Sequence, residues 1–219
     1  MKNYISATLL FLLVFTLQFT YAQEDTPFQE EVDRRAKEID DSGWQKGSTV
    51  FTGSSSVRMW DNLEDQFPDV ALINSAFGGS QAEHLLMHLD KTVLRYSPSK
   101  VFVYEGDNDI NDGKEVTEIM ENLDKIVSEI QAKFPDTIVN LIAAKPSPSR
   151  WDKKNSYLAL NDLIRQYATS HEGVHIVNVW DIMLDDTGKP RADIFLEDDL
   201  HMNETGYELW KEIFTPFLK

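Results

Sequence analysis

Short apolar runs alternate with longer amphipathic segments along most of the chain. Five runs rich in β-branched and aromatic residues predict strands, at 49–52, 70–74, 100–104, 137–143 and 174–178. Between and after them, apolar residues that recur about every 3.6 positions predict helices, at 57–66, 81–95, 116–134, 153–170 and 204–217. The sequence therefore predicts an α/β fold.

Strands that alternate with helices pair in parallel through right-handed crossovers, so helices cover both faces of the sheet. We expect a three-layer α/β/α sandwich around a five-stranded parallel sheet. Ligands bind such sheets beyond the carboxyl ends of the strands. Chemistry is therefore expected in five places: the loops 53–56, 75–80, 105–113 and 145–152, and the stretch after 178.

The N-terminus has a different pattern from the rest of the chain. Lys2 precedes an apolar run at 5–19, and the small residues Thr20 and Ala22 stand at the third and first positions before Gln23. This is typical of a secretory signal peptide, here 1–22, and the run is short for the alternative of an uncleaved membrane anchor.

The remaining residues, 23–219, suit a single domain. Phe28, Val32, Ala36 and Ile39 share one face of a predicted helix that ends at Gly43. We expect this segment, 23–47, to be a helical extension that lies over the domain.

The composition excludes several kinds of partner. The net charge is −16, and loss of 1–22 removes one Lys and no acid, which makes it −17. Such a charge repels nucleic acid and anionic membranes, so we expect neither as a partner and no stable membrane insertion after cleavage. The chain has no Cys, which excludes disulfides, thiolate chemistry and a lipid-anchored cysteine. A secreted or periplasmic location is expected.

Two strand-end loops carry residues suited to nucleophilic catalysis. Three serines, 54–56, follow Gly53 where a strand turns into a helix, a position at which backbone N–H groups stabilise an anion. A serine there can also serve only as a helix cap. Asp198 precedes His201 by three residues, so its carboxylate can orient the imidazole as a base. A capping acid beside a surface histidine is the alternative.

Two other patterns match metal sites incompletely. His84 and His88 are four residues apart, but no third ligand stands at a known zinc spacing. The segment 107–118 nearly matches a calcium-binding EF-hand loop, but Asp112 occupies the position where the sharp turn needs Gly. We therefore predict no metal and no other cofactor.

Four segments in this order resemble the sequence blocks of the SGNH, or GDSL-type, hydrolases: 53–56, 74–80, 106–109 and 198–201. The resemblance covers about residues 50–207 and implies a flavodoxin-like fold. Two residues depart from the family pattern. Ser54 replaces the acid of the Gly-Asp-Ser form, and Ala76 stands where many relatives have glycine.

The resemblance also implies a role for each matching residue. Ser55 would be the nucleophile, His201 the base and Asp198 the residue that orients it. The Ser55 N–H, the Gly79 N–H and the Asn108 side chain would form the oxyanion hole, and glycine and asparagine in strand-end loops suit that task, although each can also be only a turn residue.

We therefore predict a secreted serine esterase that forms an acyl-enzyme and acts on a small-molecule or carbohydrate ester. The alternatives are a lysophospholipase- or lipase-type acylhydrolase and a non-catalytic glycan-binding protein on the same scaffold. Acyl transfer to a sugar stays open as well.

Polar residues dominate the loops around the predicted triad and favour short, acetyl-type acyl groups on a carbohydrate. Trp151 is a candidate for stacking on the sugar. The residues of this predicted polar rim are Glu105, Asp107, Asp109, Asn111, Asp112, Ser147, Arg150, Trp151, Asp152, Asp193, Glu197 and Asp199.

Overall fold

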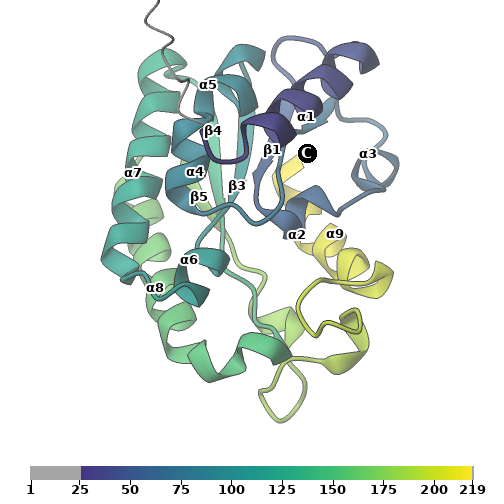
Figure 1. Ribbon diagram of the computed structural model, residues 1–219, viewed down its shortest axis with the longest axis vertical. Coiled ribbons are helices and arrows are strands. Elements are labelled where there is room, and N and C mark those ends of the chain that lie inside the picture. The colour runs from purple at the N-terminus through teal and green to yellow at the C-terminus, as the bar shows by residue number, and fades with distance from the viewer. Residues whose placement is uncertain (1–25, 219) are drawn as a thin grey trace, which may run out of the picture.

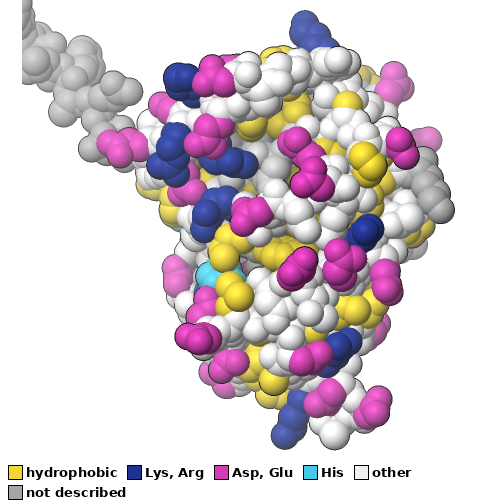
Figure 2. Space-filling view, turned by 90° about the vertical axis from the view of Figure 1, so that its right-hand side faces the viewer, with side chains coloured by type: hydrophobic (Ala, Val, Ile, Leu, Met, Phe, Trp, Pro, Cys, Tyr) yellow, Lys and Arg dark blue, Asp and Glu magenta, His cyan; other side chains and the backbone are white. Residues whose placement is uncertain are grey.

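A computed structural model describes residues 26–218, so the predicted signal peptide lies outside the described residues. Within that range, no helix has both the length and the apolar character needed to cross a membrane. Acidic side chains are spread over the face shown in Figure 2.

Five parallel strands form the centre of the molecule (Figure 1). They are β1 (Thr49–Gly53), β2 (Leu72–Asn74), β3 (Lys100–Tyr104), β4 (Ile138–Ile142) and β5 (Val174–Val177). Their spatial order is β2-β1-β3-β4-β5, which is the order of flavodoxin-like sheets. The predicted five-stranded parallel sheet is confirmed, with each strand boundary within two residues of its predicted place.

Helices cover both faces of this sheet. On one face lie α1 (Gln29–Ser42), α4 (Ala82–Met87), α5 (Leu89–Thr92), α7 (Val116–Lys133) and α8 (Lys154–Ser170). On the other lie α2 (Ser55–Arg58), α3 (Leu63–Gln66) and α9 (Glu204–Leu218). Successive side chains of β3 enter opposite cores, Val101 and Val103 on the first face and Phe102 and Tyr104 on the second.

The remaining helices are short and lie in the connections. They are η1 (Leu94–Tyr96), α6 (Asp107–Asn111), η2 (Pro148–Lys153), η3 (Asp181–Met183) and η4 (Ala192–Ile194). Helix α6 forms inside the segment 105–113, which the sequence predicted to be a loop.

Two helices predicted to be continuous are broken. The segment 57–66 divides into α2 and α3, and at the break the buried Trp60 ring stacks on Tyr207 with ring centroids 5.5 Å apart. The segment 81–95 divides into α4, α5 and η1, and at its first break His88 Nε2 lies 2.6 Å from the Pro27 carbonyl. Helical periodicity does not reveal such tertiary contacts, so the prediction of continuous helices was wrong.

Helix α1 forms where the amphipathic pattern predicted it. Val32, Ala36 and Ile39 are buried, and Gly43 ends the helix with φ of +81°. The Glu31 carboxylate accepts the Gly78 N–H at 3.0 Å, so α1 also holds the loop after β2.

The end of β1 lies directly against the end of β3. Gly53 has φ of +119°, and a Cβ at this position would lie 2.1 Å from the Tyr104 carbonyl oxygen. The Ser54 N–H donates to that same carbonyl at 3.0 Å. Only glycine has both the conformation and the space that this approach requires.

We predict that Gly53→Ala destabilises the protein more than Gly113→Ala does. Gly113 also has positive φ, +84°, but an added Cβ there would meet nothing within 4 Å. Strain alone should cost Gly113→Ala about 1–2 kcal/mol, whereas steric overlap should raise the cost of Gly53→Ala above about 3 kcal/mol. Urea unfolding measures both free energies, and equal losses would contradict the close approach.

Candidate active site

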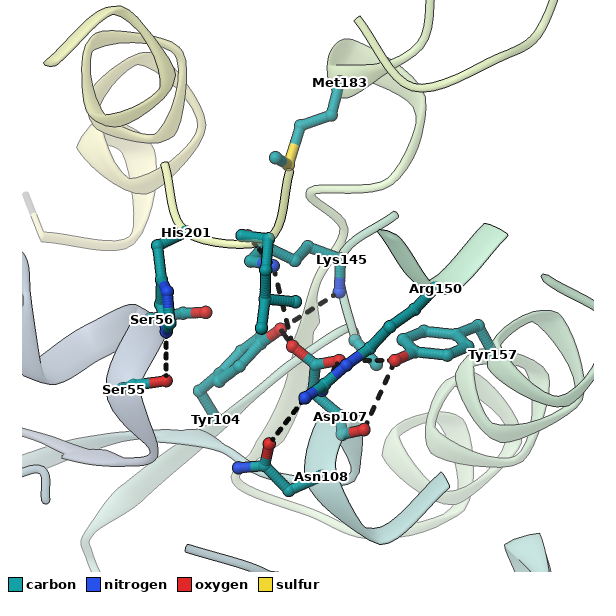
Figure 3. A network of polar contacts seen from close by, with 12 residues as sticks. Ser55, Ser56, Tyr104, Asp107, Asn108, Lys145, Arg150, Tyr157, Met183 and His201 are labelled. Carbon is teal, nitrogen blue, oxygen red and sulfur yellow. Dashed lines mark hydrogen bonds and ion pairs between the residues drawn. The ribbon is translucent and has the colours of Figure 1, made fainter. Parts of the chain in front are cut away.

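Ser55, His201 and Asp198 form a continuous hydrogen-bonded chain at the carboxyl end of β1. Ser55 Oγ lies 2.9 Å from His201 Nε2 (Figure 3). His201 Nδ1 lies 2.6 Å from Asp198 Oδ2. The fold thus brings the predicted nucleophile to the predicted base, although 146 residues separate them in sequence.

The Asp198 carboxylate is held by its own turn. Its Oδ1 accepts the N–H groups of Leu200 at 3.0 Å and of His201 at 2.9 Å. Burial acts to raise the pKa of the Asp198 carboxyl, but hydrogen bonds from His201 and from the two backbone groups lower it to about 2. An ionised Asp198 favours the Nδ1–H tautomer of His201, which leaves Nε2 free to accept the Ser55 hydroxyl proton.

Three hydrogen-bond donors lie at the same edge of the sheet as Ser55, in the loops that follow β1, β2 and β3. Within residues 26–218, the N–H groups of Ser55 and Gly79 donate to no protein acceptor. Asn108 Nδ2 donates one hydrogen to the Ser80 carbonyl at 2.8 Å, and its Oδ1 accepts Arg150 Nη2 at 3.1 Å, so one Nδ2 hydrogen remains. These are the three predicted oxyanion-hole groups, and they follow β1, β2 and β3, which are neighbouring strands.

The predicted polar rim is only partly at the surface. Glu105, Asp107, Asp109 and Ser147 are at most 4% exposed, so the prediction that they line the rim was wrong. The carboxyl groups among them accept hydrogen bonds inside the protein: Glu105 Oε1 accepts the Ser80 hydroxyl at 2.7 Å, and Asp109 accepts backbone N–H groups.

The incomplete metal patterns have structural contacts instead. The first residues of the EF-hand-like segment form α6, and Asp107 and Asp109 face protein donors. His84 Nδ1 accepts the Gln81 N–H at 3.2 Å, and His88 contacts the Pro27 carbonyl. Among the described residues, no group of three or more His, Cys, Asp or Glu could hold a metal ion.

Trp151 is half-buried and packs on Trp180, with ring centroids 5.9 Å apart and planes at 22°. Lys154 Nζ lies 4.8 Å from the centre of the Trp151 ring. These contacts favour a packing role, and the stacking of Trp151 on a sugar stays a prediction.

A buried network around Asp107 was not identified from the sequence. Asp107 Oδ1 accepts Arg150 Nη1 at 2.6 Å and the Tyr157 hydroxyl, and Oδ2 accepts the Tyr104 hydroxyl at 3.0 Å (Figure 3). Lys145 Nζ lies 3.6 Å from the same Oδ2. Burial acts to raise the pKa of the Asp107 carboxyl, but the two cations lower it below its usual value.

Lys145 is fully buried and joins this network to the loop that contains Leu200 and His201. Its Nζ donates to the Leu200 carbonyl at 2.8 Å, one residue before His201. The available sequence signal was a pair of cations, Lys145 and Arg150, directly after the apolar strand 137–143.

The sequence model of the GDSL-like lipase/acylhydrolase family matches residues 41–209. The chain belongs to this family. The predicted family resemblance is therefore confirmed, and ester hydrolysis is the reaction that membership implies. No curated protein matches the chain.

Solved structures share the fold of this GDSL-type chain. A GDSL-like lipase from Bacteroides thetaiotaomicron VPI-5482 has a TM-score of 0.73 at 20% identity, over 85% of this chain and 96% of the other. A provisionally named acylhydrolase from Bacteroides fragilis NCTC 9343 has a TM-score of 0.75 at 20% identity, over 85% and 94%. A lipase/acylhydrolase from Enterococcus faecalis has 0.64 at 24% identity, over 78% and 97%. At these identities the likeness shows the fold.

We predict that Glu105→Gln changes how stability depends on pH. Burial, and then the nearby Asp109, raise the pKa of the Glu105 carboxyl well above its usual range, and Oε2 has no partner among the described residues. Above about pH 4.3 the folded state therefore binds more protons than the unfolded state, so the free energy of unfolding falls as pH rises.

Glutamine is neutral at every pH and avoids this loss. The free energy of unfolding of Glu105→Gln, measured in urea relative to wild type, should increase as pH is raised from 4 toward 8. The exposed Glu121→Gln is the matched control and should show no such trend. A difference that stays constant with pH would contradict the buried, protonated Glu105.

Proposed function

We propose that this GDSL-type acylhydrolase is a secreted serine esterase that uses Ser55, His201 and Asp198 as its catalytic triad. The observation that carries the proposal is the unbroken chain of two contacts, 2.9 Å from Ser55 Oγ to His201 Nε2 and 2.6 Å from His201 Nδ1 to Asp198 Oδ2. This is the arrangement that an acyl-transfer mechanism requires.

In the first half-reaction, Ser55 Oγ bonds to the acyl carbon as its proton passes to His201 Nε2. The carbonyl oxygen becomes an oxyanion, which the N–H groups of Ser55 and Gly79 and the Asn108 Nδ2–H stabilise. When the tetrahedral intermediate collapses, the ester C–O bond breaks and the departing alcohol takes the proton from His201. Water then repeats the sequence on the acyl-enzyme and releases the acid.

A short acyl group on a polar alcohol is the substrate best supported. Lipolytic enzymes receive long acyl chains on broad apolar surfaces. Among the described residues, the large hydrophobic side chains that are well exposed are Met87 and Leu196, at 54% and 41%, and they do not form such a surface. The net charge of −16 further disfavours anionic lipid surfaces.

A cavity of about 360 Å³, whose lining includes residues close to Ser55 and His201 in sequence, is the site that we propose for the alcohol. Its wall includes Met202, which follows His201, and Met59, whose N–H donates to the Ser55 carbonyl at 2.9 Å. Because His201 must protonate the leaving alcohol, the alcohol has to lie on the His201 side of the acyl carbon.

The lining of this cavity combines apolar and hydrogen-bonding side chains, a mixture that suits the C–H faces and hydroxyl groups of a sugar. Of its polar residues, Asp61 and Glu204 are exposed carboxylates that can accept hydroxyl protons. The lining residues are Met59, Asp61, Asn62, Leu196, Met202, Asn203, Glu204 and Tyr207. We therefore propose an acetylated carbohydrate as substrate, outside the cytoplasm in view of the predicted leader.

We predict that Ser55→Ala abolishes hydrolysis of nitrophenyl acetate, because of the three serines 54–56 only Ser55 has its Oγ within hydrogen-bond distance of His201 Nε2. The neighbouring serines are matched controls, and Ser54→Ala and Ser56→Ala should keep most of the activity. Steady-state kinetics on the three purified variants, with folding checked by circular dichroism, decides the matter. Comparable losses of activity in all three variants would contradict the assignment of Ser55 as the nucleophile.

We also predict that activity on nitrophenyl esters falls steeply beyond about four acyl carbons, as expected for a site that accommodates few methylene groups. Rates from acetate to decanoate measure this directly. Faster turnover of octanoate or of a lysophospholipid would favour the lipolytic alternative and leave the triad unaffected.

On an acetylated sugar, Glu204→Ala should raise KM, whereas its KM for nitrophenyl acetate should stay near that of wild type.

A further inference from the structure

The orientation of the Asn108 amide decides whether it can serve an oxyanion. Its nitrogen carries hydrogens and its oxygen does not, so a rotation that exchanges the two would place an acceptor against the negative charge. The Ser80 carbonyl accepts from Nδ2 at 2.8 Å, and Arg150 Nη2 donates to Oδ1 at 3.1 Å. Because a carbonyl only accepts and a guanidinium only donates, both contacts select the same orientation.

Arg150 is itself held firmly. Its Nη1 donates to Asp107 Oδ1 at 2.6 Å, and the Arg150 and Asp107 side chains are only 12% and 5% exposed. Figure 3 shows the guanidinium between the Asp107 carboxylate and the Asn108 amide, with the amide nitrogen turned away from it. Tyr157 and Tyr104 also donate to Asp107, which leaves that carboxylate little freedom to move.

We propose that Arg150 is a positioning residue for the oxyanion hole, which fixes the Asn108 amide with Nδ2–H directed to the oxyanion. This role rests on the proposed function. Arg150 donates to Asp107 through Nη1 and to Asn108 through Nη2, so in this role it acts through Asn108. By drawing electron density toward Oδ1, the guanidinium also makes Nδ2–H a stronger donor.

A double-mutant cycle tests the proposal. Values of kcat and KM on nitrophenyl acetate are compared for wild type, Arg150→Ala, Asn108→Ala and the double variant. Asn108→Ala should lower kcat by about 10²–10³, and Arg150→Ala should lower it by about 10- to 100-fold with KM near wild type. The double variant should be no more than about 2-fold slower than Asn108→Ala, because the two residues act as one unit.

Arg165→Ala, which removes an exposed arginine paired with Asp162 on α8, is the control and should match wild type. If Arg150→Ala does not fold because the Asp107 charge loses a buried partner, Arg150→Lys takes its place. An ammonium keeps the charge but cannot donate to Asp107 and Asn108 in one planar fork. Arg150→Lys alone should then lower kcat to the same extent. Added to Asn108→Ala, it should cause no such loss.

Each of three results would overturn the role of Arg150. They are independent losses of kcat in the double-mutant cycle, a change confined to KM, and a wild-type kcat in folded Arg150→Lys. Ser55→Ala is measured in parallel. Full activity in Ser55→Ala would overturn the proposed function and the role of Arg150 with it. An inactive Ser55→Ala together with independent losses would overturn the role of Arg150 alone.

Discussion

The hydrogen bond from the Ser54 N–H to the Tyr104 carbonyl, 3.0 Å long, joins the end of β1 to the end of β3. It forms only because Gly53 has no side chain to separate the strands. On the other side, the Phe77 N–H donates to the Gly53 carbonyl at 3.0 Å, which joins the loop after β2. One backbone turn therefore holds together the three loops that carry the proposed nucleophile and oxyanion donors.

Buried charged side chains also hold the loops of the candidate site together. Asp107 precedes Asn108 in α6, and Lys145 links the Asp107 carboxylate to the carbonyl of Leu200, beside the proposed base. Burying charges in this way costs desolvation energy, and well-packed apolar side chains in the same place often stabilise a protein at least equally. In this protein the buried charges connect the two sides of the site, a task for which apolar side chains lack the directional contacts.

The loops of the candidate site could be predicted from the sequence because their signals are local, whereas the choice of Ser55, Gly79 and Asn108 within those loops came from the resemblance to SGNH hydrolases. A strand is recognisable from its apolar run, and the loop that follows it must lie at the carboxyl edge of a parallel sheet. Ser55, Gly79 and Asn108 each stand just after such a run. Asp198 and His201 are three residues apart, so one turn of backbone is enough to bring their side chains together.

Tertiary structure alone decided which polar residues became buried and which partners they found. Arg150 and Asp107 are 43 residues apart, and nothing in the pattern around either one encodes their contact. The same holds for the helix break at Trp60 and for the burial of Glu105. Local periodicity records which face of an element is apolar, whereas these contacts depend on which loops the strand order β2-β1-β3-β4-β5 brings together.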